Sequence, residues 1–287
     1  MEQMTQRYID SCPVGCAPPL EATDIALPEG PLLRCPECGQ LVSQITAQAW
    51  HASMEQFDEV GYNQPAGREL ERRYAVARRR LLRIAALLER DPGDIRLLDV
   101  GCSRGQFLEA ALMLGFQGEG VEPAPGIAAA AREKGLAVHT GLLEEQRFPD
   151  AEFAAVTMFE VIEHLREPAS LLAECRRILE PGGILLLSTG NTASWTVRAM
   201  KGRWDYFDVA RDAGHVSFFN PGSIERLAAR CGYAVEGIET ARVKFHDKGD
   251  VPRAAYLAGK LAAEALNLPA RLAAAGHDML AWLRRPR

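Results

Sequence analysis

The feature that most constrains this chain is an apolar run that ends at two glycines and leads into a helical pattern. The run spans residues 95–100, the glycines are Gly101 and Gly105, and apolar residues then recur at helical spacing from Phe107 to Leu114. This order predicts a buried strand, a tight turn and a helix. Glycine lets a ligand approach the backbone of such a turn, where N–H groups and the helix N-terminus can bind polar atoms. The pattern therefore predicts an α/β fold with a binding site at this turn.

A second short strand adds a carboxylate to the predicted site. Residues 118–122 read Gly-Glu-Gly-Val-Glu, and Glu122 lies 23 residues after Asp99. In dinucleotide-binding folds an acid at this place accepts two hydrogen bonds from the hydroxyl groups of a ribose. Turn, helix, second strand and terminal acid, in this order, predict a nucleoside ligand.

The motif Asp-Val-Gly-Cys-Ser-Arg-Gly at residues 99–105, with Glu122 behind it, resembles the first two motifs of the class I S-adenosylmethionine-dependent methyltransferases. Nicotinamide enzymes carry GxGxxG instead. The resemblance implies a Rossmann-like seven-stranded sheet of order 3-2-1-4-5-7-6, with an antiparallel last strand and helices on both faces. It implies S-adenosylmethionine as cofactor, bound by Asp99, Gly101, Cys102, Gly105, Glu122, Leu142, Leu143 and Phe159.

Two details of this assignment stay open. The family usually carries a further glycine where Ser103 stands, and serine should narrow the conformational freedom of the turn. In the family, the turn that holds Leu142 and Leu143 lies along the adenine. Simple core packing is the other interpretation of these two leucines.

The remaining elements of the expected domain, residues 93–287, follow from periodicity and from turn signals. We expect helices at 125–134, 168–180 and 221–231, strands at 136–139, 153–158 and 184–187, a sixth strand that starts at 232–235, and a final strand at 278–284. In the resembling fold the last of these strands lies between the fifth and the sixth. Residues 251–275 predict two helices broken at Pro269, which could pack on the domain, form a dimer face or lie on a membrane surface. Three cations against one acid are too few to favour lipid.

Four of the seven cysteines form two close pairs near the N-terminus. Cys12 and Cys16 make one pair, and Cys35 and Cys38, within Cys-Pro-Glu-Cys-Gly, make the other. Four thiolates suit tetrahedral Zn²⁺ and leave no open position for catalysis, so residues 1–48 predict a structural zinc ribbon. An empty relic of such a site and a set of redox thiols are the alternatives. Similar knuckles precede the methyltransferase domain in enzymes of sugar and natural-product biosynthesis and in one group of ribosomal-RNA methyltransferases.

A helical connector is expected over residues 49–92. Apolar residues keep helical spacing from Leu70 to Leu88, and six arginines lie between Arg72 and Arg83. Because glutamates balance these arginines, a solvated face is favoured over a phosphate-binding patch.

Composition limits the classes of partner. The formal net charge of −5 argues against nucleic-acid binding by bulk electrostatics. The chain has no run of eighteen apolar residues, and Met1-Glu2-Gln3 does not begin a signal pattern. We therefore expect a cytoplasmic protein.

The next chemical signal is Phe-Glu-Val-Ile-Glu-His at residues 159–164, just past the expected fourth strand. It resembles the EVIEHL segment of a methyltransferase subgroup that includes the quinone-biosynthesis O-methyltransferases and the small-RNA 3′-terminal 2′-O-methyltransferases. His164 could be a general base for a hydroxyl proton. Alternatively Glu160, Glu163 and His164, joined by a distant histidine, could hold Mg²⁺ or another divalent ion, as the resemblance implies. In a third interpretation Glu160 lies near the charged end of the cofactor and His164 caps the turn.

Residues 190–220 are expected to form a long acceptor loop, because aromatic and polar residues follow each other there without a clear period. His215 begins a segment that resembles the H-x-x-x-F of the same subgroup. It is the second catalytic candidate, as a base or as the fourth metal ligand. A purely structural histidine is the alternative.

The sequence therefore predicts methyl transfer to a hydroxyl of a small-molecule or sugar-linked acceptor, by a protein that could form a homodimer. One alternative is an RNA methyltransferase in which the zinc ribbon and the arginine-rich helix bind phosphates. The other is a non-catalytic partner protein that binds the cofactor.

Overall fold

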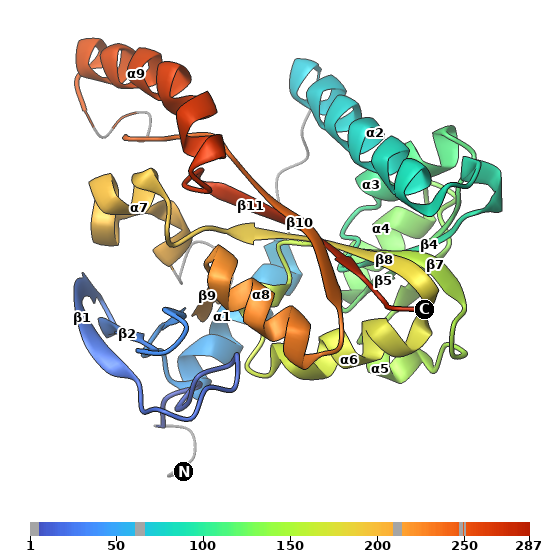
Figure 1. The fold of residues 1–287 in the computed structure, drawn as a ribbon, viewed down its shortest axis with the longest axis horizontal. Coiled ribbons are helices and arrows are strands. Elements are labelled where there is room, and N and C mark those ends of the chain that lie inside the picture. Colours follow the sequence, from blue (N-terminus) through green and yellow to red (C-terminus); the bar gives the residue numbers. More distant parts are fainter. Residues whose placement is uncertain (1–5, 61–66, 209–213, 247–248, 250) are drawn as a thin grey trace.

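The centre of the molecule is a seven-stranded sheet (Figure 1). The computed structural model describes residues 6–60, 67–208, 214–246, 249 and 251–287, and of 55–60 only the backbone. The strand order is β10-β11-β8-β7-β4-β5-β6, and β11 is antiparallel to both of its neighbours. The other pairings are parallel. This is the order predicted from the resemblance, and the expected fold class is confirmed.

The elements of this domain lie within a few residues of their expected places. The strands are β4 (Arg96–Val100), β5 (Gln117–Glu122), β6 (Val138–Thr140), β7 (Phe153–Phe159), β8 (Leu179–Gly190), β10 (Ala234–Ala241) and β11 (Asp278–Arg284). The helices are α2 (Arg68–Leu88), α3 (Gln106–Met113), α4 (Pro125–Arg132), α5 (Leu143–Gln146), α6 (Pro168–Ile178), α8 (Pro221–Arg230) and α9 (Arg253–Leu272), and short 3₁₀ turns are η2 (Pro92–Asp94) and η3 (Ile162–His164).

The largest difference in bounds is at β8. It begins at Leu179, before the Pro-Gly-Gly that was expected to precede the strand. Leu179 pairs with Phe153 and Ile184 pairs with Ala155, so the residues between them bulge out while pairing resumes on both sides.

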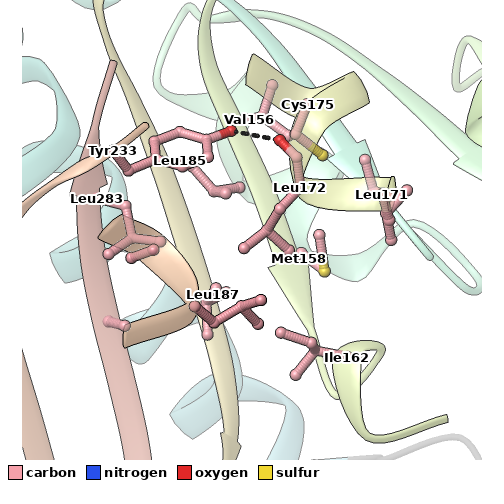
Figure 2. Close-up of a cluster of buried hydrophobic side chains, with 14 of the residues drawn as sticks. Val156, Met158, Ile162, Leu171, Leu172, Cys175, Leu185, Leu187, Tyr233 and Leu283 are labelled. Carbon is pink, nitrogen blue, oxygen red and sulfur yellow. Dashed lines mark hydrogen bonds between the residues drawn. The ribbon is translucent and has the colours of Figure 1, made fainter. Parts of the chain in front are cut away.

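Each face of the sheet has its own apolar core. Side chains of α2, α3 and α4 cover one face, and those of α6 and α8 cover the other. Figure 2 shows part of the second core, where Leu171 and Leu172 of α6 meet Val156 and Leu185 of the sheet. The hydroxyl of Tyr233 donates to the Leu172 carbonyl at 3.0 Å. These cores hold the carboxyl ends of β4, β5, β7 and β8 at one edge of the sheet.

A second, four-stranded sheet lies beside the first. Its order is β1 (Glu21–Leu27), β2 (Gly30–Arg34), β3 (Leu41–Val42) and β9 (Ser217–Phe218), with every pairing antiparallel. Three strands come from the expected zinc-ribbon segment, but β9 comes from the expected acceptor loop. The helix α1 (Ala47–Val60), most of which lies within the expected helical connector, follows β3. The division into segments 1–48, 49–92 and 93–287 stays a prediction, and 61–66 of its connector lie outside the described residues.

The segment 190–220 contains regular structure that its sequence did not predict. It forms α7 (Trp195–Met200), the 3₁₀ turns η4 (Lys201–Arg203) and η5 (Asp205–Phe207), and β9, while 209–213 lie outside the described residues. Trp204, Phe207 and Phe218 are buried against apolar side chains of β1, β2 and β3. The apolar residues of segment 190–220 show no helical or strand period because several very short elements pack into one core. These three rings are core residues.

The prediction of two helices broken at Pro269 is wrong, because α9 runs through this proline to Leu272. Proline removes one helical hydrogen bond, but the turn around it is held by its surroundings. Ala270 is fully buried, and its carbonyl accepts from the Ala275 N–H at 2.8 Å. The outer face of α9, which extends away from the sheet in Figure 1, exposes Leu257, Leu261, Leu268 and Leu272 by 49 to 81%. Its role as a dimer or membrane contact stays a prediction.

None of the helices in the described part of the chain combines the length and the apolar character that crossing a membrane requires.

Candidate functional site

The turn after β4 has the strained backbone that its glycines predict. Gly101, Ser103 and Gly105 have φ angles of 69°, 48° and 78°. A Cβ on Gly101 would lie 2.5 Å from Cγ2 of Val161, and one on Gly105 would overlap the Leu136 side chain. Ser103 thus adopts a left-handed conformation that costs a serine more than a glycine. The turn is closed by N–H groups of Gly101 and Cys102, which donate to the Val121 carbonyl at 2.8 and 3.1 Å.

Glu122 lies at the end of β5 and faces this turn. Its carboxylate is buried and accepts from the Ser103 N–H at 2.8 Å and from the Ala124 N–H at 3.0 Å. These two bonds fix the acid at the carboxyl edge of the sheet, beside the helix that starts after Gly105. The structure therefore brings together the turn and the acid that the sequence predicts to bind a ribose.

Asp99 lies below the turn, on β4. It is buried, and its Oδ1 accepts from the Thr157 hydroxyl at 2.5 Å. Burial raises the pKa of Asp99 to about 7; the Thr157 bond lowers it and the Glu122 carboxylate raises it further. Asp99 thus braces β4 against β7 under the site.

Two of the predicted cofactor residues point into the protein. The Cys102 thiol is buried against Gly120, where a Cβ would come within 2.6 Å of its sulfur. Leu143 is also buried and belongs to the core of the sheet, whereas Leu142 is 55% exposed. Of the two leucines, only Leu142 presents most of its side chain to solvent.

Phe159, at the end of β7, forms one wall of the site with two residues that sequence reasoning did not assign. Its ring centroid lies 4.7 Å from that of Phe107, and the Arg80 guanidinium carbon lies 4.9 Å from the centroid of Phe159. Burial lowers the pKa of Arg80. Arg80 lies in the arginine-rich helix that the sequence predicts. That helix has seven arginines from residue 68 to 83, so the sequence does not indicate which of them lies against the site.

Glu160 and Glu163, in the segment directly after β7, share one hydrogen-bond partner, the Tyr206 hydroxyl. Each acid also accepts from a hydroxyl of β8: Glu160 from Ser188 at 2.7 Å and Glu163 from Thr189 at 3.1 Å. Burial raises the pKa of Glu163 well above its usual value, and the Glu160 carboxylate raises it further. The buried pair thus favours the neutral form of the Glu163 carboxyl group.

The two candidate histidines meet beside these acids. The ring centroids of His164 and His215 are 4.6 Å apart, and His215 Nε2 lies 3.8 Å from a Glu163 oxygen. His215 Nδ1 lies 3.1 Å from the Tyr206 carbonyl oxygen. A carbonyl only accepts, so Nδ1 carries the hydrogen and Nε2 keeps a lone pair. Burial lowers the pKa of His215 to about 3, with the His164 charge next in effect, and the ring is neutral near pH 7.

Three of the four predicted ligands of a divalent metal are within reach of one ion. The ligand atoms of Glu163, His164 and His215 all lie within 4.8 Å of one another, and Glu160 is not part of that group. One carboxylate and two imidazoles suit first-row transition metals, whereas Mg²⁺ prefers oxygen ligands. The donor set therefore fits Mg²⁺ poorly.

The four N-terminal cysteines also come together. Their sulfurs lie within 4.8 Å of one another, and those of Cys12 and Cys38 are 3.6 Å apart. Burial raises the pKa of the Cys35 thiol, but backbone N–H groups of Cys38 and Glu37 outweigh it and the pKa is lowered. A cluster of four sulfurs with backbone donors that stabilise a thiolate is compatible with Zn²⁺.

A model of the methyltransferase domain family matches residues 68–237. The chain belongs to this family. The match covers the turn, Glu122 and both acids of the Glu160–Glu163 pair, but it stops short of β11, and the cysteine cluster lies before it.

Relatives and solved structures agree with this methyltransferase domain. The chain is 36% identical over 121 residues to the ubiquinone biosynthesis O-methyltransferase of Xanthomonas axonopodis pv. citri, which covers 39% of this chain and 49% of the relative. The chain thus spans about half the length of that curated relative. A solved structure of an S-adenosylmethionine-dependent methyltransferase from Mesorhizobium loti is similar, with a TM-score of 0.52 and 19% identity. The alignment covers 71% of this chain and 96% of the Mesorhizobium loti chain. Phosphoethanolamine N-methyltransferase 2 of Haemonchus contortus, solved with S-adenosyl-L-methionine, has a TM-score of 0.52 at 19% identity. That alignment covers 82% of this chain and 56% of the Haemonchus contortus chain. At these identities the two structures show the fold alone.

Proposed function

We propose that this protein transfers the methyl group of S-adenosylmethionine to a hydroxyl of a small-molecule or sugar-containing acceptor. The observation that carries the proposal is that His215, His164 and Glu163 meet at the edge of the sheet where the Gly101–Gly105 turn and Glu122 also lie. The names of the curated relatives, which are O-methyltransferases, support a hydroxyl as the methylated group.

On the donor side, the chain offers a partner for each part of S-adenosylmethionine. Glu122 accepts hydrogen bonds from the ribose, and Leu142 packs along the adenine. The Arg80 guanidinium, held over Phe159, pairs with the methionine carboxylate. In the described part of the structure the Arg80 guanidinium forms no ion pair or hydrogen bond, so its N–H donors are open to this contact.

S-adenosylmethionine supplies an electrophilic methyl group on a sulfonium sulfur. The acceptor oxygen forms the new C–O bond as the S–C bond breaks, and the hydroxyl proton goes to Nε2 of His215. The Tyr206 carbonyl holds the Nδ1–H and thus keeps the lone pair of Nε2 directed into the site. Catalysis rests mainly on holding donor and acceptor in line.

A second candidate for the acceptor side is a divalent transition metal held by Glu163, His164 and His215. The closeness of their ligand atoms favours it. Such an ion supplies Lewis-acid polarisation of the acceptor hydroxyl. Metal analysis of the purified protein, with rates measured before and after chelation, separates the two candidates. A rate that survives chelation leaves His215 as the base, and a rate restored by an added divalent ion favours the metal.

We also propose that Cys12, Cys16, Cys35 and Cys38 hold a structural Zn²⁺. The convergence of four sulfurs supports it. The expected content is one zinc per chain by elemental analysis, and the Cys35→Ser variant should lose the metal and unfold at a lower temperature. A wild-type protein without zinc that is equally stable would contradict this role.

The decisive experiment is methyl transfer from isotope-labelled donor to the small molecules of a cell extract, read by mass spectrometry. The expected result is a product heavier by one CH₂ group that forms with the wild type and is lost with His215→Ala. Two other outcomes support the rivals. Labelled RNA, with binding that weakens steeply as salt rises, favours an RNA methyltransferase. Donor binding without any labelled product favours the non-catalytic partner.

A further inference from the structure

We propose that the acceptor carries a phosphate or diphosphate group, which binds in a cationic groove between the N-terminal sheet and α7. This proposal rests on the proposed function, because it assigns a chemical class to the substrate of the same site. The groove is distinct from the Gly101–Gly105 turn and from the His164–His215 pair. None of the motifs in the sequence points to it.

The groove has a volume of about 390 Å³ and is formed by segments far apart in the chain. Asp24 and Arg34 line it from β1 and β2, and Arg198 and Lys201 line it from α7 and η4. β1 lies close to η4, and a Cβ on Gly202 would come within 2.9 Å of the Ala26 carbonyl. The close backbone approach fixes the spacing of the two walls, so the cations on them face one defined space.

Its charge balance suits an anion. Three side chains of the groove are cations, and Asp24 is the only acid among its lining residues. Lys201 Nζ pairs with Asp24 at 3.3 Å, on the solvent side, where both side chains are at least 64% exposed. The guanidinium groups of Arg34 and Arg198 form neither an ion pair nor a hydrogen bond within the described residues, and so keep their donors for a ligand. Two guanidiniums on opposite walls match the oxygens of a phosphate or diphosphate.

The groove and the methyl-transfer site are both lined by the segment at the end of β8. Thr189, whose hydroxyl donates to Glu163, and Thr192, which lines the groove, are three residues apart. Three residues of chain span at most about 11 Å. On this proposal, a small phosphorylated molecule spans the distance between His215 and the two arginines, with its hydroxyl at His215 and its phosphate in the groove. A polynucleotide is disfavoured, since the chain has a formal net charge of −5.

The test uses the purified chain of residues 1–287 and inorganic pyrophosphate as the probe, with binding followed by calorimetry at low salt. We expect the Arg34→Gln/Arg198→Gln double variant to bind pyrophosphate at least tenfold more weakly than the wild type. Arg203→Gln is the matched control: it removes an exposed arginine of the same η4 turn that does not line the groove, and it should keep wild-type affinity. Failure of the wild type to bind pyrophosphate at millimolar concentration, or equal binding by the double variant, overturns the proposal.

Two further arms separate the phosphate sources and the two proposals. Vesicles that contain phosphatidylglycerol test whether the groove binds a lipid phosphate. If the wild type sediments with these vesicles and the double variant does not, while the wild type does not bind pyrophosphate, a soluble acceptor is rejected. Titration with S-adenosylhomocysteine tests the donor site separately, and it should be equal in the wild type and the double variant. If that ligand does not bind while pyrophosphate does, the methyltransferase proposal fails and the anion site remains.

Discussion

The turn and the acid at the centre of the donor side come from one stretch of sequence, residues 97–124, whereas the acceptor side is assembled from segments far apart in the chain. In the donor half, Ser103 and Ala124 hold Glu122 through backbone N–H groups within that stretch. In the acceptor half, Glu163 depends on Thr189 and Tyr206, and His215 on Tyr206. A local site is readable from a motif, and an assembled one is readable only from the fold. The two halves should also fail separately when mutated, and four predictions test this.

The largest effect is expected for His215→Ala, on the acceptor side. Loss of the Nε2 lone pair should slow methyl transfer by about 10² to 10⁴-fold, with affinity for S-adenosylhomocysteine unchanged. Single-turnover rates and calorimetry measure the two quantities. His139→Ala is the control, since His139 pairs with Glu119 on the sheet, away from the site. A His215→Ala enzyme that keeps the wild-type rate would remove His215 from the mechanism, and His164→Ala would then become the test of the remaining base.

The second prediction concerns Glu122→Ala, on the donor side. Two charge-assisted hydrogen bonds to the ribose are lost, so affinity for S-adenosylhomocysteine should fall by roughly 100-fold, about 2.7 kcal/mol. At saturating donor the rate should recover in large part. Glu119→Ala is the matched control on the same strand, because Glu119 pairs with Arg96 and His139 instead. Equal affinity of the Glu122 variant and the wild type would mean that the ligand lies elsewhere.

The third prediction concerns the backbone of the donor turn. Gly101→Ala combines a φ of 69° with a contact to Val161, so it should lower the free energy of unfolding by about 2 kcal/mol. The matched control is Gly126→Ala in α4, where nothing lies within 4 Å of the added Cβ, and which should be neutral or stabilising by up to ~1 kcal/mol. Thermal unfolding measures both. Equal melting temperatures for the two variants would show that this turn carries no strain.

The fourth prediction is a pH dependence of stability from Asp99. Because burial raises its folded-state pKa to about 7, the folded chain keeps a proton that the unfolded chain loses above about pH 4. Asp99 therefore makes stability fall as pH rises from 4 to 7, by at most about 1.4 kcal/mol per pH unit. Asp99→Asn should remove this slope. Denaturant unfolding at several pH values checks it, and parallel curves for the two proteins would contradict the shift.

The sequence predicts the seven-stranded sheet well because each of its elements carries a local signal: an apolar run, a period or a glycine turn. The final strand matches its predicted bounds, Asp278–Arg284. Its place between β8 and β10 comes from the family resemblance, since a strand's neighbours are not encoded in its own pattern.

The residues of the acceptor half could be predicted from the sequence, but their arrangement in space could not. Glu163, His164 and His215 carry motif signals, and the structure brings them together. Tyr206 does not stand out among the aromatic residues around it, although its hydroxyl joins both acids. Arg34 and Arg198 gave no signal either, because a groove between the N-terminal sheet and α7 depends on how these two elements meet.

The pairing of Leu41–Val42 with Ser217–Phe218 has a consequence for synthesis of the chain. The ribosome makes β3 about 175 residues before its partner, which corresponds to roughly 9 to 35 s of translation at 5–20 residues per second. Throughout that time the nascent polypeptide presents β3 as an open edge, the kind of surface that recruits unwanted strands. The N-terminal sheet closes only after β8 has emerged, so a chaperone that shields residues 21–42 during elongation would raise the yield of native protein.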